Sequence, residues 1–111
     1  MDINDSIKYQ ILTYCFFNKT LISNTDLDFL TELSKNPKVE ISKFCNILTE
    51  KSIFKSPQSA RNAISKAEKK NLLIKNGINK KTISIKKEIN VQVKGLVLLN
   101  YKILGNESQE A

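Results

Sequence analysis

Residues 56–75 decide the fold class, and they read SPQSARNAISKAEKKNLLIK. Ser56 is a residue type that caps helix N-termini, and Pro57 suits the first helical position. Small and apolar residues recur behind them at helical spacing, namely Ala60, Ala63, Ile64 and Ala67. Asn71 suits the left-handed residue that ends a helix. The stretch therefore predicts a helix over residues 57–70 with one buried face.

Beyond Asn71 the apolar spacing changes from the 3.6-residue period of a helix to the two-residue period of a strand. Residues 73–75 and 82–85 are predicted strands. The loop between them opens with Asn76-Gly77, a favourable turn dipeptide. A β-hairpin is therefore predicted directly after the helix.

Two more helices are predicted before Ser56. The first spans residues 24–35, has N-cap candidates at residues 23–25 and ends at Asn36-Pro37. The second spans residues 40–49. Its apolar residues stand at i, i+3, i+4 and i+7, namely Ile41, Phe44, Cys45 and Leu48. The resulting order is three helices and then two strands.

Both ends of the chain are predicted to add strands. Residues 7–17 carry a helical stripe, but their Tyr, Thr, Ile and Phe content favours a strand, which we predict. Alternation resumes at residues 89–93, and residues 96–103 are almost continuously apolar. This last strand either pairs with residues 7–17 in the same chain or forms a homodimer through the terminal strands. Residues 105–111 are expected to be a frayed polar tail, which leaves residues 1–104 as one domain.

The charge of the chain is divided unevenly. Residues 1–50 carry five basic and seven acidic residues, whereas residues 51–111 carry thirteen basic and four acidic residues. Lys, Asn and Ile share A/T-rich codons, so codon bias explains part of the lysine content. Codon bias does not explain why the two halves differ in sign. A basic half favours a polyanionic partner such as nucleic acid.

The predicted order resembles that of the winged helix-turn-helix family over about residues 24–86. Residues 56–75 resemble the recognition helix and wing entry of bacterial winged-helix regulators, with Leu72-Leu73 as the leucine pair that enters the wing. Asn71 departs from the glycine usual there, and the connector before Ser56 is longer than a tight turn. The resemblance implies an α+β winged helix of three helices plus a β-hairpin wing, here with extra N- and C-terminal strands.

The chain also looks similar to small winged-helix proteins encoded by tailed bacteriophages. Four segments carry this similarity: DLDFLT (26–31), FKSPQS (54–59), AEKKNL (67–72) and LLNYKI (98–103). The resemblance implies a role in regulating, packaging or building a phage.

The predicted outward face of helix 57–70 suits double-stranded DNA. Gln and Asn can bond adenine edges, Arg can form two bonds to guanine, and Lys and Ser suit phosphates. The basic hairpin loop is expected to contact the DNA backbone. The candidate DNA-binding residues are Gln58, Ser59, Arg61, Asn62, Ser65, Lys66, Lys69, Lys75, Lys80 and Lys81. The competing interpretation is a solvated, lysine-rich surface without a partner.

The sequence contains no candidate catalytic residues. The chain has no histidine, only three glycines and only two cysteines, Cys15 and Cys45, so the sequence offers no imidazole base, phosphate loop or zinc site. We expect no enzyme activity, catalytic residue, metal, cofactor or small-molecule substrate. Each cysteine lies in an apolar stretch and is expected to be a buried thiol in a reducing compartment.

No apolar run approaches the roughly 18 residues of a membrane span, and the N-terminus is acidic where a signal peptide would be basic. We therefore expect a cytoplasmic protein without a membrane partner. The expected function is DNA binding, as a transcriptional regulator or accessory factor of a phage or mobile element. The alternative is a structural or adaptor protein of the phage virion that uses the same fold for protein–protein contacts.

Overall fold

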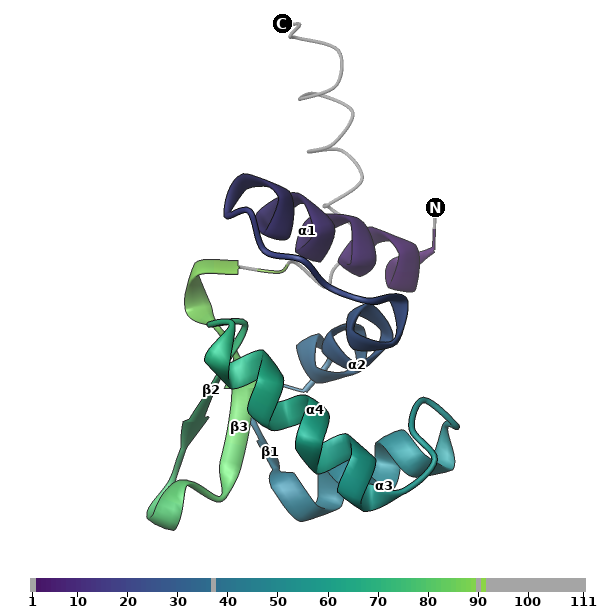
Figure 1. Ribbon diagram of the computed structural model, residues 1–111, viewed down its shortest axis with the longest axis vertical. Coiled ribbons are helices and arrows are strands. Elements are labelled where there is room, and N and C mark those ends of the chain that lie inside the picture. Colours follow the sequence, from purple (N-terminus) through teal and green to yellow (C-terminus); the bar gives the residue numbers. More distant parts are fainter. Residues whose placement is uncertain (1, 37, 90, 92–111) are drawn as a thin grey trace, which may run out of the picture.

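The computed structural model describes residues 2–36, 38–89 and 91, which form an α+β fold (Figure 1). Its helices are α1 (Ile3–Phe17), α2 (Asn24–Ser34), α3 (Ile41–Glu50) and α4 (Pro57–Lys69). Its strands are β1 (Val39–Glu40), β2 (Leu73–Asn76) and β3 (Thr82–Ile85). The short 3-10 helix η1 (Ile78–Lys80) lies between β2 and β3, and η2 (Lys87–Ile89) follows β3. The predicted strand at residues 96–103 and the predicted tail lie outside the described residues.

Helices α2 and α4 begin where the local sequence predicts. The Ser23 hydroxyl oxygen accepts a hydrogen bond from the backbone N–H of Asp26 at 3.1 Å. The Ser56 hydroxyl oxygen accepts one from the N–H of Ser59 at 3.2 Å. Helix α4 is followed by Asn71 in the left-handed conformation, with φ 62°. The predictions from these capping residues are confirmed because the interactions that set helix ends are local.

The predicted strand at residues 7–17 is wrong, because these residues form most of α1. The Asp2 carboxylate caps this helix by accepting from the N–H of Asp5 at 2.9 Å. Its buried stripe contains Ile7, Ile11 and Cys15, at i, i+4 and i+8. Contact with α2 lets this stripe enter the core, and burial of a helical stripe outweighs the weak strand preference of the aromatic and β-branched residues. Within the described residues the fold therefore has four α-helices, and α1 takes the place of the predicted N-terminal strand.

The sheet has the order β1-β3-β2 and is antiparallel throughout. The hairpin of β2 and β3 is confirmed, and Leu73 pairs with Ile85 in its register. Strand β1 was not predicted. It is only two residues long and pairs Val39 with Ile83, so it depends on a partner far along the chain. The alternation that begins at Ile89 does not mark a strand there, since Ile89 ends η2.

The β2–β3 loop needs glycine at its first position. Gly77 has φ 81°, and a Cβ at this position would lie 2.7 Å from the hydroxyl oxygen of Thr82. The Thr82 hydroxyl donates a hydrogen bond to the backbone oxygen of Asn76 at 2.7 Å. The loop thus turns tightly over Thr82. This turn fixes the backbone from which the side chains of Lys80 and Lys81 project.

One hydrophobic core joins the helices to the sheet. Helix α1 packs on α2, α3 packs on α4, α2 contacts β3 and α4 contacts β2. The rings of Phe29 and Phe44 lie 5.9 Å apart within this core. Figure 1 shows α1 at one end of the described part of the chain, with the β2–β3 loop and the start of α3 towards the opposite end.

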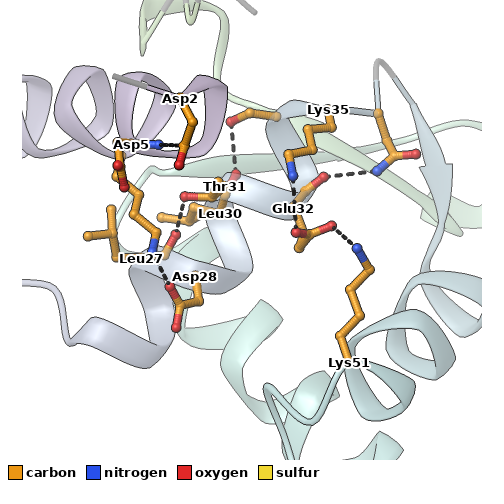
Figure 2. Close-up of polar contacts among 12 residues, drawn as sticks. Asp2, Asp5, Leu27, Asp28, Leu30, Thr31, Glu32, Lys35 and Lys51 are labelled. Atoms are coloured by element: carbon orange, nitrogen blue, oxygen red, sulfur yellow. Dashed lines mark hydrogen bonds and ion pairs between the residues drawn. The ribbon is translucent and has the colours of Figure 1, made fainter.

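Ion pairs tie α2 to both of its neighbours (Figure 2). Asp28 pairs with Lys8 of α1 at 3.0 Å, and this contact holds the pKa of Lys8 above its ordinary value. Glu32 pairs with Lys35 at 3.4 Å and with Lys51, just after α3, at 3.0 Å. Asp28 and Glu32 of α2 therefore act as structural ion-pair partners.

Both cysteines are free, buried thiols, as predicted. Burial raises the pKa of the Cys15 thiol and of the Cys45 thiol above their ordinary value, and the thiolate is the reactive form.

We expect a disulfide reagent to modify the cysteines of the native protein roughly 100-fold more slowly than those of the unfolded chain. The reason is that the reaction needs an opening of the core, and each tenfold slowing corresponds to about 1.4 kcal/mol of opening free energy. Absorbance of the released reagent thiol, with and without denaturant, measures both rates. Rapid modification of native thiols would contradict this packing.

None of the helices within residues 2–36 and 38–89 combines the length and the apolar character that crossing a bilayer requires.

Candidate functional site

A cleft opens where α3 begins, beside α4 and the β2–β3 loop. It has a volume of about 430 Å³, and we call it the basic cleft. Its lining residues are Glu40, Ile41, Ser42, Arg61, Lys80 and Lys81. Three cations from two distant segments therefore share this cleft with one carboxylate.

Backbone contacts hold the walls of the basic cleft together. The N–H of Ile41, at the start of α3, donates to the backbone oxygen of Lys81 at 2.9 Å. Next to it, Glu40 of β1 pairs with Thr82 of β3. These contacts bind the end of the β2–β3 loop to the N-terminal end of α3. The pairing of β1 with β3 therefore determines where Lys80 and Lys81 lie.

Arg61 enters the basic cleft from α4. Its Nη2 donates a hydrogen bond to the hydroxyl oxygen of Ser42 at 2.8 Å. Guanidinium has five donors, so this bond leaves several for an anionic ligand. The planar arrangement of these donors matches phosphate geometry, and a helix N-terminus also favours negative charge. The cleft therefore has the chemistry of a phosphate site.

The outer face of α4 adjoins the cleft and is exposed. Gln58 and Asn62 are one turn apart, and the Gln58 Nε2 donates to the Asn62 Oδ1 at 3.1 Å. This pair keeps an amide oxygen and an amide N–H available, which are the groups needed to bond an adenine edge. Ser65, Lys66 and Lys69 are exposed farther along α4.

Two of the predicted site residues have structural partners. Ser59 is half-buried, and both its N–H and its hydroxyl lie within hydrogen-bond distance of the Ser56 hydroxyl, so it belongs to the helix cap. Lys75 of β2 is half-buried and pairs with Glu68 of α4 at 3.5 Å. The other eight candidates are exposed, and the structure brings Arg61, Lys80 and Lys81 of these together in the basic cleft.

The sequence interpretation missed the contribution of α3. Ser42 contacts Arg61, and Ile41 fastens the loop, yet neither residue was a candidate. A polar residue in the first turn of the second helix was the available signal. This signal does not predict which residue Ser42 contacts unless the packing of α3 on α4 is known.

The basic character of the second half of the chain persists in the described part. Residues 51–89 carry eleven lysines and arginines against two acids, Glu68 and Glu88. Glu68 is paired with Lys75, so its charge is partly offset. Among the described residues there is no group of three or more His, Cys, Asp or Glu side chains that could hold a metal ion.

No family model, curated protein or solved structure matches the chain.

Proposed function

We propose that the protein is a winged-helix protein that binds double-stranded DNA. In this proposal α2, α3 and α4 are the three helices of the family, α4 is the recognition helix, and β2, β3 and their loop are the wing. The order of elements and the β1-β3-β2 sheet support the assignment. Helix α1 is an addition at the N-terminal side.

The basic cleft carries the proposal. Arg61, Lys80 and Lys81 converge beside the N-terminal end of α3, and the exposed face of α4 continues from this point. A phosphate bound in the cleft positions the duplex, so that α4 lies along the major groove. Gln58 and Asn62 are then the base-reading pair, whereas Lys66 and Lys69 contact backbone phosphates. Glu40 at the rim opposes anions, so the three cations must outweigh it.

The biological role that we propose is that of a transcriptional regulator or accessory factor of a phage or mobile element. The similarity of sequence segments to small phage-encoded winged-helix proteins is its support. The same similarity leaves a virion adaptor as the alternative, which DNA binding tests directly.

Binding to a short DNA duplex is expected to weaken steeply with salt. About four phosphate contacts release counterions and give a log–log slope of roughly −3.6, so that a fourfold rise in salt weakens binding on the order of 100-fold. Fluorescence anisotropy of a labelled duplex, titrated at several salt concentrations, measures the slope. Absence of binding at low salt, with the protein folded, would reject the proposal and favour the virion adaptor.

A further inference from the structure

The outer side of α1 carries a continuous apolar surface. Its members, which we call the α1 face, are Tyr9, Leu12, Phe16, Phe17 and Leu21. Phe16 is 78% exposed, Phe17 is 75% exposed and Leu21 is 86% exposed. The inner side of α1 already packs in the core, since Ile7 and Ile11 are fully buried. The exposed side therefore has the character of an interface and not of a solvated helix surface.

The α1 face is shaped to receive protruding side chains. A hollow of about 550 Å³ is bordered by Leu12, Phe16 and Leu21. A second hollow of about 300 Å³ is bordered by Tyr9, Leu12 and Phe16. Leu12 and Phe16 thus form a ridge with a groove on each side, which suits a ridge of the same kind.

The charges at the two ends of the α1 face identify the partner. Asp5 lies one turn before Tyr9 on the same side of the helix and is exposed. Lys19 follows the end of the helix, is exposed and lines the larger hollow together with Leu12 and Phe16. Asp5 and Lys19 are each seven residues from Leu12. The surface therefore runs from an acidic end through an apolar centre to a basic end.

We propose that α1 pairs antiparallel with α1 of a second copy of this chain, about a twofold axis near Leu12. In this arrangement Asp5 of each copy lies opposite Lys19 of the other, and Tyr9 lies near Phe16. A parallel pair would instead place like charges together. Such a twofold contact uses the same surface on both copies, as dimers of identical chains do.

The size of the α1 face is sufficient for this dimer. With about 200 Å² of surface for each large side chain, the five exposed fractions amount to roughly 700 Å². Stable interfaces bury about 600–1,000 Å² on each partner, so this area lies within their range. Within the described residues, α1 lies at the opposite end from the β2–β3 loop and the start of α3, which line the basic cleft, so the dimer leaves both clefts open (Figure 1).

This dimer replaces the expected pairing of terminal strands. Residues 3–17 form a helix, so a strand from this segment is not available. The proposal does not rest on DNA binding, and its test contains no DNA.

The test is the mass of the full chain in solution, measured by light scattering or sedimentation equilibrium over a range of concentrations. We expect twice the 12.6 kDa of one chain. Phe16→Glu is expected to give a monomer. Ile78→Glu is the matched control, since Ile78 is 88% exposed but lies in η1 outside the α1 face, and this variant should remain dimeric. Thermal melts establish that both variants are folded.

Charge exchange tests the antiparallel arrangement. Asp5→Lys and Lys19→Asp are each expected to weaken the dimer roughly fivefold, because each places two like-charged pairs across the axis. The double variant should recover the affinity of the original chain. The proposal is overturned if the original chain is a monomer, even if something else covers the α1 face. It is also overturned if Phe16→Glu leaves the dimer unaffected. Single exchanges that strengthen the dimer, or a double variant that does not recover, overturn the antiparallel arrangement.

Discussion

Ile64→Asp is expected to unfold the protein. Ile64 lies on the inner side of α4 and is only 2% exposed. The substitution removes an apolar side chain from the core, which by itself costs about 2–5 kcal/mol. It also buries a carboxyl group without a partner, and the two costs together reach the whole stability of a typical domain, about 5–15 kcal/mol.

Circular dichroism during thermal and urea unfolding measures this effect. Ser65→Asp is the matched control, since it introduces the same charge at the next position of α4, which is exposed. We expect its unfolding free energy to change by less than about 1 kcal/mol. A cooperative, near-original melt for Ile64→Asp would contradict the assignment of inner and outer faces of α4.

Arg61→Glu is expected to weaken DNA binding roughly 10- to 150-fold, since a hydrogen bond to a charged group contributes about 1.5–3 kcal/mol. The variant removes the guanidinium from the basic cleft, ends its bond to Ser42 and adds a second carboxylate beside Glu40. All DNA sequences should be affected alike, because the proposed partner of this guanidinium is a phosphate. The magnitude of the salt slope should fall by about 0.9 for each phosphate that the variant no longer neutralises.

Two comparisons make this measurement specific. Lys38→Glu changes the net charge by the same amount at an exposed residue that does not line the cleft, so binding should change little. Asn62→Ala removes a member of the proposed base-reading pair and should reduce the preference for a selected site over a scrambled one. Equally weakened binding in Arg61→Glu and Lys38→Glu would mean that only net charge matters, and the basic cleft would not have its proposed role.

If the proposals for α1 and α4 both hold, each dimer presents two recognition helices. A twofold dimer favours a DNA site with two related halves, because the symmetry of the site then matches that of the protein. The spacing of the halves is set by the α1–α1 contact. The two measurements remain separable, since Phe16→Glu leaves the basic cleft of each copy unchanged.

Local sequence was sufficient for α2, α3, α4 and the β2–β3 hairpin. The N-cap at Ser56, the proline after it and the left-handed Asn71 act within a few residues, so their effects can be predicted without the rest of the chain. The exposed positions of Arg61 and Asn62 follow from the phase of the same helix. The candidates on the outer side of α4 are exposed for this reason, apart from the half-buried Ser59.

Residues 3–17 were a different case, because their two local signals conflict. Tyr9, Thr13 and Phe16 favour a strand, whereas Ile7 and Ile11 stand at helical spacing. The helix forms because α2 provides an apolar surface that buries this stripe, and that surface is not encoded within the segment. The exposed α1 face is a consequence of the same packing.

The sequence by itself determined three helices, a hairpin and the polar side of α4, because each depends on residues that are near one another in the chain. The unequal distribution of charge is a property of the sequence itself. Only the tertiary structure decided that β1 exists, that Lys75 pairs with Glu68, and that Ser42, Arg61 and Lys81 share one cleft. These features join separate elements of the fold and depend on the angles at which those elements pack. Burial of the common core determines such relations, and no short stretch of sequence contains them.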